Sequence, residues 1–214
     1  MLEYYDRRAP EYDQWYMGTG LFAERNRPGW HEELGGLCAA VATLPPATTL
    51  DVACGTGFLT RHLRGAVTGL DQSAQMLEIA RERIPGGRVV QGDAVPLPFD
   101  DGSFDRVFTG HFYGHLRAGE RERFVAEARR VAGQLVVVDS HVRPDHDAEE
   151  EQRRTLNDGS VHGVYKRYFT GAGLAAELDG GEVVHDGDWF VMVRSSNLPV
   201  AQFELASGHG DQAA

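Results

Sequence analysis

A short apolar strand that runs into a glycine-rich turn constrains this chain more than any other feature of its sequence. Residues 50–60 read Leu-Asp-Val-Ala-Cys-Gly-Thr-Gly-Phe-Leu-Thr. Gly55 and Gly57 have no Cβ, so the backbone can adopt positive φ there and a ligand can approach main-chain N–H groups closely. Asp51 ends the strand with a carboxylate, which disfavours a phosphate ligand beside the turn and favours a cationic amine.

These residues resemble motif I of class I S-adenosylmethionine (SAM) dependent methyltransferases, in which an acidic residue precedes a Gly-x-Gly turn. Ala53 stands where many members carry a further glycine, which suggests that position 53 does not need positive φ. A dinucleotide-binding loop requires a third small residue three positions after its second glycine. Thr60 occupies that position here, so a NAD-dependent reductase is disfavoured.

Length and composition predict one globular domain. The chain has 214 residues, of which 42% are hydrophobic, enough for one sizeable core. We expect a single domain over residues 1–196, with an N-terminal lid and first helices over 1–47 and a core over 48–196. Residues 197–214 lack periodicity and are expected to form a flexible tail.

Charge and cysteine usage limit the partners and the compartment. The formal net charge is −11 and no run is rich in Lys or Arg, which argues against nucleic acid. Cys38 and Cys54 form neither a disulfide framework nor a metal-binding spacing. Neither a secretory leader nor an apolar run of roughly 20 residues is recognisable. We therefore expect a cytoplasmic protein without a membrane partner, as a monomer or homodimer.

Short aliphatic runs alternate with segments of helical period, which predicts an α/β domain with a largely parallel sheet. Strands are predicted over 48–53, 66–70, 88–91, 105–109 and 134–139. Helices are predicted after an N-cap at Ser73 and over 120–132. Residues 182–185 and 189–194 predict a final antiparallel hairpin. This arrangement again resembles the class I methyltransferase fold, which implies a Rossmann-like, seven-stranded, mostly parallel sheet with helices on both faces and an N-terminal helical lid.

The resemblance also implies a SAM site, with S-adenosylhomocysteine (SAH) as the product. Asp71 ends the second predicted strand, where the family binds both ribose hydroxyls through a carboxylate; the alternative is that Asp71 only helps Ser73 to cap a helix. Residues 89–105 resemble the family's downstream run, which implies that Asp93 meets the adenine amino group and that Ala94 lies along the ring. The predicted cofactor-binding residues are Tyr12, Asp51, Ala53, Gly55, Gly57, Asp71, Gln72, Met76, Asp93, Ala94 and Thr109.

The end of the fourth predicted strand supplies candidate catalytic residues. Ligands of open α/β sheets bind outside the carboxyl ends of the strands. His111, Tyr113 and His115 follow the strand at that edge. A histidine there can remove a proton from the acceptor as the methyl group arrives, and we predict His111 and His115 as the catalytic residues. Alternatively, His111 only forms a hydrogen bond and His115 faces water.

The N-terminus resembles the lid of many small-molecule methyltransferases, in which an Ala-x-x-Tyr-Asp segment folds over the cofactor. Residues 9–13 read Ala-Pro-Glu-Tyr-Asp. Tyr12 is the predicted lid residue, and Tyr5 and Trp15 are candidate walls of the acceptor pocket. The alternative is an amphipathic helix that packs on the domain.

Two later segments bear on a metal site and on the acceptor site. His141 and the Asp-His-Asp group at 145–147 suggest a metal site, but Pro144 breaks the register that would bring these side chains together, and residues 147–151 are expected to begin a solvated helix. We therefore predict no metal. Residues 155–169 form a polar and aromatic segment. We expect this segment either to bind an anionic or aromatic acceptor or only to border the sheet.

Taken with the resemblance, these features predict a SAM-dependent methyltransferase that transfers a methyl group to an oxygen, nitrogen or carbon atom of a small molecule. Two alternatives stay open. One is a quinone-ring C-methyltransferase, which the lid and the 93–105 run also resemble. The other is a SAM-binding module without catalysis, which a cavity filled by side chains would favour.

Overall fold

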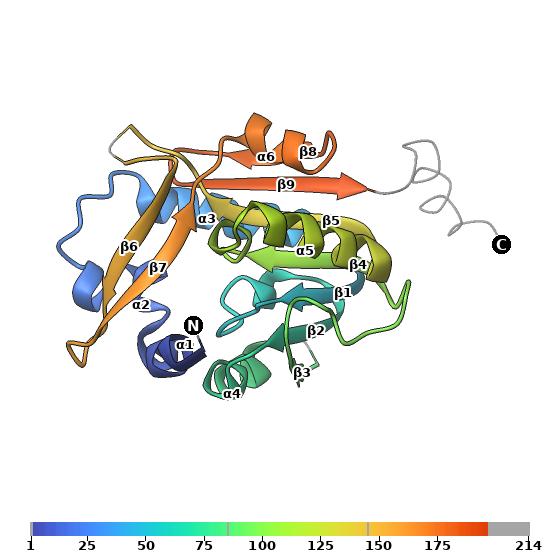
Figure 1. Cartoon of the computed structure of the whole chain (residues 1–214), viewed down its shortest axis with the longest axis horizontal. Coiled ribbons are helices and arrows are strands. Elements are labelled where there is room, and N and C mark those ends of the chain that lie inside the picture. Colours follow the sequence, from blue (N-terminus) through green and yellow to red (C-terminus); the bar gives the residue numbers. More distant parts are fainter. Residues whose placement is uncertain (1, 85, 145, 197–214) are drawn as a thin grey trace, which may run out of the picture.

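The computed structural model describes residues 2–84, 86–144 and 146–196. A seven-stranded sheet forms its centre, in the order β3-β2-β1-β4-β5-β9-β8 (Figure 1). The strands are β1 Ala47–Val52, β2 Gly65–Asp71, β3 Arg88–Gln91, β4 Phe104–Gly110, β5 Ala132–Ser140, β8 Glu182–Asp186 and β9 Phe190–Ser196. Strands β1 to β5 are parallel to one another, whereas β9 runs antiparallel to β5 and β8. The predicted α/β class and the antiparallel final hairpin are confirmed.

Helices lie on both faces of the sheet. The helices include α3 Trp30–Thr43, α4 Ala74–Arg83, α5 Ala118–Val131 and α6 Gly171–Glu177. They also include α1 Leu2–Arg8, η1 Ala9–Glu11, α2 Gln14–Met17, η2 Gly20–Phe22, η3 Thr60–His62 and η4 Tyr113–His115. The predicted tail over 197–214 lies outside the described residues.

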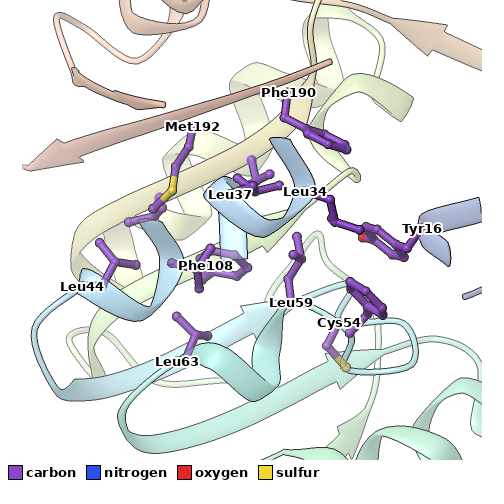
Figure 2. Packing of buried hydrophobic residues seen from close by; sticks show 14 of the residues in the cluster. Tyr16, Leu34, Leu37, Leu44, Cys54, Leu59, Leu63, Phe108, Phe190 and Met192 are labelled. Atoms are coloured by element: carbon purple, nitrogen blue, oxygen red, sulfur yellow. The ribbon is translucent and has the colours of Figure 1, made fainter. Parts of the chain in front are cut away.

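Two hydrophobic clusters, one on each face, hold the helices to the sheet. Along β5, Val136 and Val138 belong to the cluster beneath α3, whereas Leu135 and Val137 belong to the cluster beneath α5 and α6. Figure 2 shows the α3 cluster, where Leu37 lies among Phe108, Phe190 and Met192. Alternate side chains of a strand point to opposite faces, so a strand that is buried on both sides carries a continuous apolar run, as residues 135–138 of β5 do.

Local sequence signals set several helix ends. The Ser73 hydroxyl accepts a hydrogen bond from the Met76 N–H at 3.2 Å and caps α4, as predicted. The Thr170 hydroxyl likewise accepts from the Gly173 N–H at 3.0 Å at the start of α6. In α5, Phe124, Ala128 and Val131 are fully buried, so the periodic apolar positions do form its core-facing side.

A two-stranded hairpin replaces the helix start expected at 147–151. Strands β6 (Glu149–Thr155) and β7 (Val161–Arg167) pair antiparallel in a sheet of their own. Exposed and half-buried residues alternate along β6, which is the period of a strand and not of a helix. The hairpin lies beside the N-terminal segment (Figure 1), where the Asn157 N–H donates to Glu11 at 2.8 Å.

The expectation that Ala53 needs no positive φ is wrong. Its φ is 56°, close to the 54° of Gly55. The turn is tied to the sheet by the Cys54 N–H, which donates to the Leu70 carbonyl at 3.0 Å. The path of the chain therefore fixes this left-handed conformation, at a cost of roughly 1–2 kcal/mol for a residue with a Cβ.

Candidate cofactor and acceptor site

A cavity of about 370 Å³ lies at the carboxyl ends of β1, β2 and β4, beneath the N-terminal segment. Most of the residues predicted from the sequence line it. These are Tyr12, Ala53, Gly55, Asp71, Gln72, Met76, Asp93, Ala94, His111 and His115. Tyr5, a predicted wall of the acceptor pocket, lines it too. The parallel strands converge at this edge, so segments distant in sequence share one cavity.

The sequence did not identify the part of the wall that comes from α5 and from the end of β4. Gly110, Phe112 and Leu116 line the cavity, as do Glu120 and Arg123 of α5. The rule that ligands bind at the carboxyl edge of the sheet could have indicated the first two. The α5 side chains reach the cavity only through the packing of that helix, for which the sequence carries no local signal.

The glycine-rich turn forms one wall of the cavity. Gly55 has φ 54°, and a Cβ at this position would lie 3.5 Å from the Tyr12 ring. The lid tyrosine therefore covers the backbone that a ligand would approach. Gly57 has φ 76° and faces α4, where a Cβ would lie 3.3 Å from Ile84. Gly57 thus permits close packing of the turn on α4 and does not line the cavity.

The Asp71 carboxylate holds the turn and also faces the cavity. One oxygen accepts from the Gly55 N–H at 2.9 Å, and the other accepts from the Ser73 N–H at 2.9 Å. Burial raises the pKa of this carboxyl group, while these backbone hydrogen bonds oppose the shift. The helix-capping role is therefore present in the structure, and it leaves further lone pairs of the carboxylate for a ligand hydroxyl.

Gln72 and Asp93 form the neighbouring rim. The Gln72 side-chain amide donates to Asp93 at 2.7 Å, and Ala94 and Val95 continue the wall. The Asp93 carboxylate is exposed, so it remains available to accept a hydrogen bond from a bound amino group.

Asp51 lies behind the main cavity, in a hollow with room for about one water molecule. Tyr12, Ala53 and Gly110 line both spaces. One Asp51 oxygen accepts from the Thr60 hydroxyl, and the other is buried without a hydrogen-bond partner among the described residues. Burial raises the pKa of Asp51 to about 8. An unpartnered buried carboxylate oxygen is the feature that a cationic amine would satisfy.

Several predicted site residues do not reach the cavity. The Thr109 hydroxyl donates to the Val52 carbonyl at 2.8 Å and is fully buried between β1 and β4. Tyr113 points to the opposite face, where its ring packs near Phe124 and its hydroxyl lies 3.3 Å from Glu177. Trp15 packs edge-on against His111, with ring centroids 4.9 Å apart, behind the cavity wall.

His111 occupies an unusual position at the end of β4. Its φ is 61°, its side chain is buried, and neither ring nitrogen has a hydrogen-bond partner among the described residues. Its Nδ1 lies 4.0 Å from an oxygen of Asp139. Burial lowers the pKa of His111 to about 3, against the opposing attraction of Asp139. The ring is therefore neutral near pH 7 and is a weak base in the ligand-free protein.

His115 also lines the cavity and does not face bulk water. Its Nδ1 lies 2.7 Å from the Tyr165 backbone carbonyl. A carbonyl only accepts hydrogen bonds, so this contact assigns the proton to Nδ1 and leaves Nε2 as an acceptor. Burial, followed by the charges of Lys166 and Arg154, lowers the pKa of His115 well below its usual range.

Side-chain hydrogen bonds fasten the N-terminal segment over the cavity. Asp13 accepts from the Thr56 hydroxyl at 2.6 Å and pairs with Arg83 of α4. Asp6 accepts from the Ser73 hydroxyl at 2.6 Å. The segment is thus tied to the glycine-rich turn and to the N-terminus of α4, on either side of the cavity.

The segment considered for a metal is engaged otherwise. The His141 Nδ1 contacts the Val142 carbonyl, and its Nε2 lies 3.4 Å from Asp186. The His146 ring stacks on Tyr168 with centroids 3.8 Å apart. Within residues 2–84, 86–144 and 146–196, no three His, Cys, Asp or Glu side chains are grouped as metal ligands. Over the same ranges, none of the helices has the length and apolar character needed to cross a bilayer.

Comparison with known proteins relates this chain to methyltransferases. Residues 50–136 match the model of a methyltransferase domain. A demethylmenaquinone methyltransferase of Thermotoga maritima is 40% identical over 146 residues, covering 64% of this chain and 60% of that protein. An uncharacterized methyltransferase of Alkaliphilus oremlandii is 26% identical, covering 72% and 71%. The structure of a DhpI-SAM-HEP complex has 26% identity and a TM-score of 0.69, covering 90% of this chain and 94% of that one.

The fold and the position of the cavity match those of Rossmann-like methyltransferases. The chain belongs to the class I SAM-dependent methyltransferase superfamily, as its glycine-rich turn indicated, and the expected cofactor SAM is supported by the SAM and SAH complexes of DhpI. The chain spans only about 60% of the length of the Thermotoga maritima relative.

Proposed function

We propose that this protein transfers the methyl group of SAM to an oxygen, nitrogen or carbon atom of a small molecule and releases SAH. One observation carries this proposal. A single cavity joins the glycine-rich turn, Asp71 and Asp93 to the two histidines that follow β4. It therefore has one end suited to the cofactor and another suited to an acceptor.

In this proposal, polar groups along the cavity recognise separate parts of the cofactor. Asp51 pairs with the amine through its unpartnered oxygen, and Asp71 accepts from the ribose hydroxyls. Asp93 accepts from the adenine amino group, and Met76 and Ala94 supply apolar contacts beside the ring. Gly55 allows the close approach of the ligand to the backbone.

Positioning and exclusion of water contribute most to catalysis. SAM supplies an electrophilic methyl group, and the lid that Asp13 and Asp6 fasten holds the reactants away from solvent. His111 and His115 remain the proposed catalytic residues. Because burial lowers the pKa of both, their neutral rings orient the acceptor by hydrogen bonds more effectively than they remove its proton.

Binding and turnover test this proposal separately. Calorimetry should detect SAH binding and no binding of NAD. Incubation with SAM carrying a labelled methyl group and a panel of small hydroxyl, amine, carboxylate and phosphate compounds should then label a product. Binding of NAD in place of SAH would refute the proposal. SAH binding without transfer to any acceptor would support the alternative of a non-catalytic SAM-binding module. The structure disfavours this alternative, because the cavity extends beyond the proposed cofactor residues to Leu116 and Arg123.

Methylation of a quinone ring is the second candidate. The 40% identity to the demethylmenaquinone methyltransferase over 146 residues favours it. Reduced demethylmenaquinone with a short side chain is the appropriate substrate, and a product heavier by one methyl group would establish this activity. No product with this quinol, together with methylation of a water-soluble acceptor, would exclude it.

We also propose that residues 1–196 act as one domain, that the protein works in the cytoplasm as a monomer or homodimer, and that it does not bind nucleic acid. The net charge of −11 supports the last point. Light scattering coupled to size-exclusion chromatography would determine the oligomeric state.

A further inference from the structure

Three guanidinium groups gather where the N-terminal segment meets the β6–β7 hairpin. Arg8 ends α1, Arg154 lies on β6, and Arg25 follows η2. The Tyr4 hydroxyl accepts a hydrogen bond from Arg8, and Tyr4 also raises the pKa of the nearby Arg154. Burial, and then the charges of Arg154 and Arg8, lower the pKa of Arg25. Like charges from three separate segments are thus brought close together.

No carboxylate balances these charges in the described part of the chain. Other arginines do form ion pairs, such as Arg7 with Glu3 at 2.9 Å, but Arg8, Arg25 and Arg154 form none there. Arg154 donates from Nε and Nη2 to the neutral Gln152 side chain at 3.0 and 2.8 Å. The carboxylate of Glu150, on the same strand, accepts from Gln152 and from Tyr168.

The surrounding phenols do not supply the missing negative charge. Burial raises the pKa of Tyr5 to about 12 and raises that of Tyr12 as well. Both are neutral near pH 7, whereas a guanidinium does not lose its proton in proteins. Arg8 is only 8% exposed, and its Nε is buried without a hydrogen-bond partner among the described residues. A buried cation without a partner is strongly destabilising, and an anion bound here would offset that cost.

This cluster lies behind Tyr5 and Tyr12, two residues of the cavity wall. The Arg8 guanidinium lies 5.1 Å from the centre of the Tyr12 ring, and Tyr12 and Tyr5 line the cavity. The charge of Arg154 also lowers the pKa of His111 and of His115, so it acts on both proposed catalytic residues.

We propose that the methyl acceptor carries an anionic oxygen group, a carboxylate or a phosphate-type group, bound by Arg154 and Arg8 between α1 and the β6–β7 hairpin. This inference rests on the proposed function and names the substrate class of the same site. A guanidinium presents paired N–H donors that match two oxygens of such a group, and charge-assisted hydrogen bonds of this kind are the strong ones. Arg25 adds positive charge at the exposed side.

An anionic acceptor also explains how the reaction can proceed although both histidines are weak bases. An ionised oxygen already holds its nucleophilic lone pair, so no base is required. In the transfer, the sulfur–methyl bond breaks with its electron pair left on sulfur, and the oxygen–methyl bond forms from the oxygen lone pair. A positive sulfonium and a negative oxygen become two neutral groups, and no proton is released.

Inorganic phosphate is the first probe of this site. We expect its titration into SAH-saturated protein, at constant ionic strength set with sodium chloride, to raise the melting temperature in a saturable way. Arg154→Gln should weaken phosphate binding at least tenfold, because it removes a charged donor of hydrogen bonds to the anion. Arg153→Gln is the matched control, since Arg153 is the exposed neighbour on β6 and should behave as the wild type.

Further measurements separate this inference from the proposed function. Arg154→Lys keeps the charge and should recover part of the affinity, and both Arg154 variants should bind SAH as the wild type does. A saturable effect of acetate in place of phosphate would assign the site to carboxylates. Phosphate binding that is absent, or equal in Arg154→Gln and wild type, would overturn the anion site while SAH binding persists. Failure of the wild type to bind SAH would instead overturn the proposed function.

Discussion

The Asp71 carboxylate accepts a hydrogen bond from the Gly55 N–H at 2.9 Å and so ties the end of β2 to the glycine-rich turn after β1. Its second oxygen accepts from the Ser73 N–H at the start of α4. One side chain therefore fixes the relative positions of three elements that border the cavity. The shape of the proposed cofactor site depends on this contact before any ligand arrives.

Asp71→Ala should therefore weaken both the cofactor site and the fold. We expect SAH affinity to fall at least tenfold, and the free energy of unfolding of the ligand-free protein to fall by about 1–3 kcal/mol, because two backbone donors lose their acceptor. Calorimetry and urea unfolding measure the two effects. Stability equal to that of the wild type would show that water replaces the carboxylate at both N–H groups.

Gly55 and Gly102 offer a matched pair of substitutions. Both have positive φ, 54° and 64°, so replacement by alanine should cost roughly 1–2 kcal/mol of stability at either position. Only at Gly55 would the new Cβ stand at the cavity, 3.5 Å from the Tyr12 ring, whereas Gly102 faces open space. We expect Gly55→Ala to lower SAH affinity at least tenfold and Gly102→Ala to leave it unchanged. Equal SAH affinities would remove the turn from the binding site.

Asp51 should release a proton when the cofactor binds. With a pKa of about 8, raised by burial, it is mostly protonated at pH 7 in the ligand-free protein. A cationic amine beside it favours the ionised form, so binding should release close to one proton at pH 7 and strengthen as the pH rises from 6 to 8. Calorimetry in buffers of different ionisation enthalpy detects this release. Asp51→Asn should abolish the dependence of the binding enthalpy on the buffer. If the wild-type protein shows no such dependence, the proposed amine contact is contradicted.

The same shift has a consequence for the ligand-free fold. The folded pKa of Asp51 lies above the ordinary value near 3.8, so between about pH 4 and 8 the folded state binds a proton that the unfolded state has lost. Stability contributed by this group is therefore present at low pH and is lost as the pH rises through 8. Urea unfolding should show a smaller decline between pH 5 and 8 for Asp51→Asn than for the wild type.

The pH dependence of turnover should not follow the titration of a histidine with an ordinary pKa. An unperturbed histidine has a pKa of about 6.5, but burial lowers that of His111 to about 3. We expect the rate to show no decline between pH 8 and 5 that depends on His111. His111→Ala should lower turnover by less than the factor of about 100 that marks general-base catalysis. A larger loss, with an inflection near pH 6.5 in the wild type alone, would re-establish His111 as the base.

The sequence by itself determined the features that depend on local pattern and spacing. The apolar runs predicted the strands, Ser73 predicted the start of α4, and the turn at Gly55 with the acids Asp51, Asp71 and Asp93 predicted the cofactor end of the cavity. The structure confirms the strands and the helix start, and it brings Gly55, Asp71 and Asp93 to one cavity, whose cofactor stays a prediction for these residues. Strand ends, caps and positive-φ turns are set by neighbours along the chain, and parallel strands bring their carboxyl ends to one edge of the sheet.

Only the tertiary structure decided which of the remaining side chains face the cavity and in what electrostatic environment. Thr109 lies on β4, which His111 follows directly, and Tyr113 comes two residues after His111, yet both form hydrogen bonds away from the cavity. The low pKa of His111 arises from burial among residues distant in sequence. Arg8 and Arg154 meet only because the β6–β7 hairpin lies beside α1. Burial and long-range charge depend on packing between distant segments, and no local pattern encodes them.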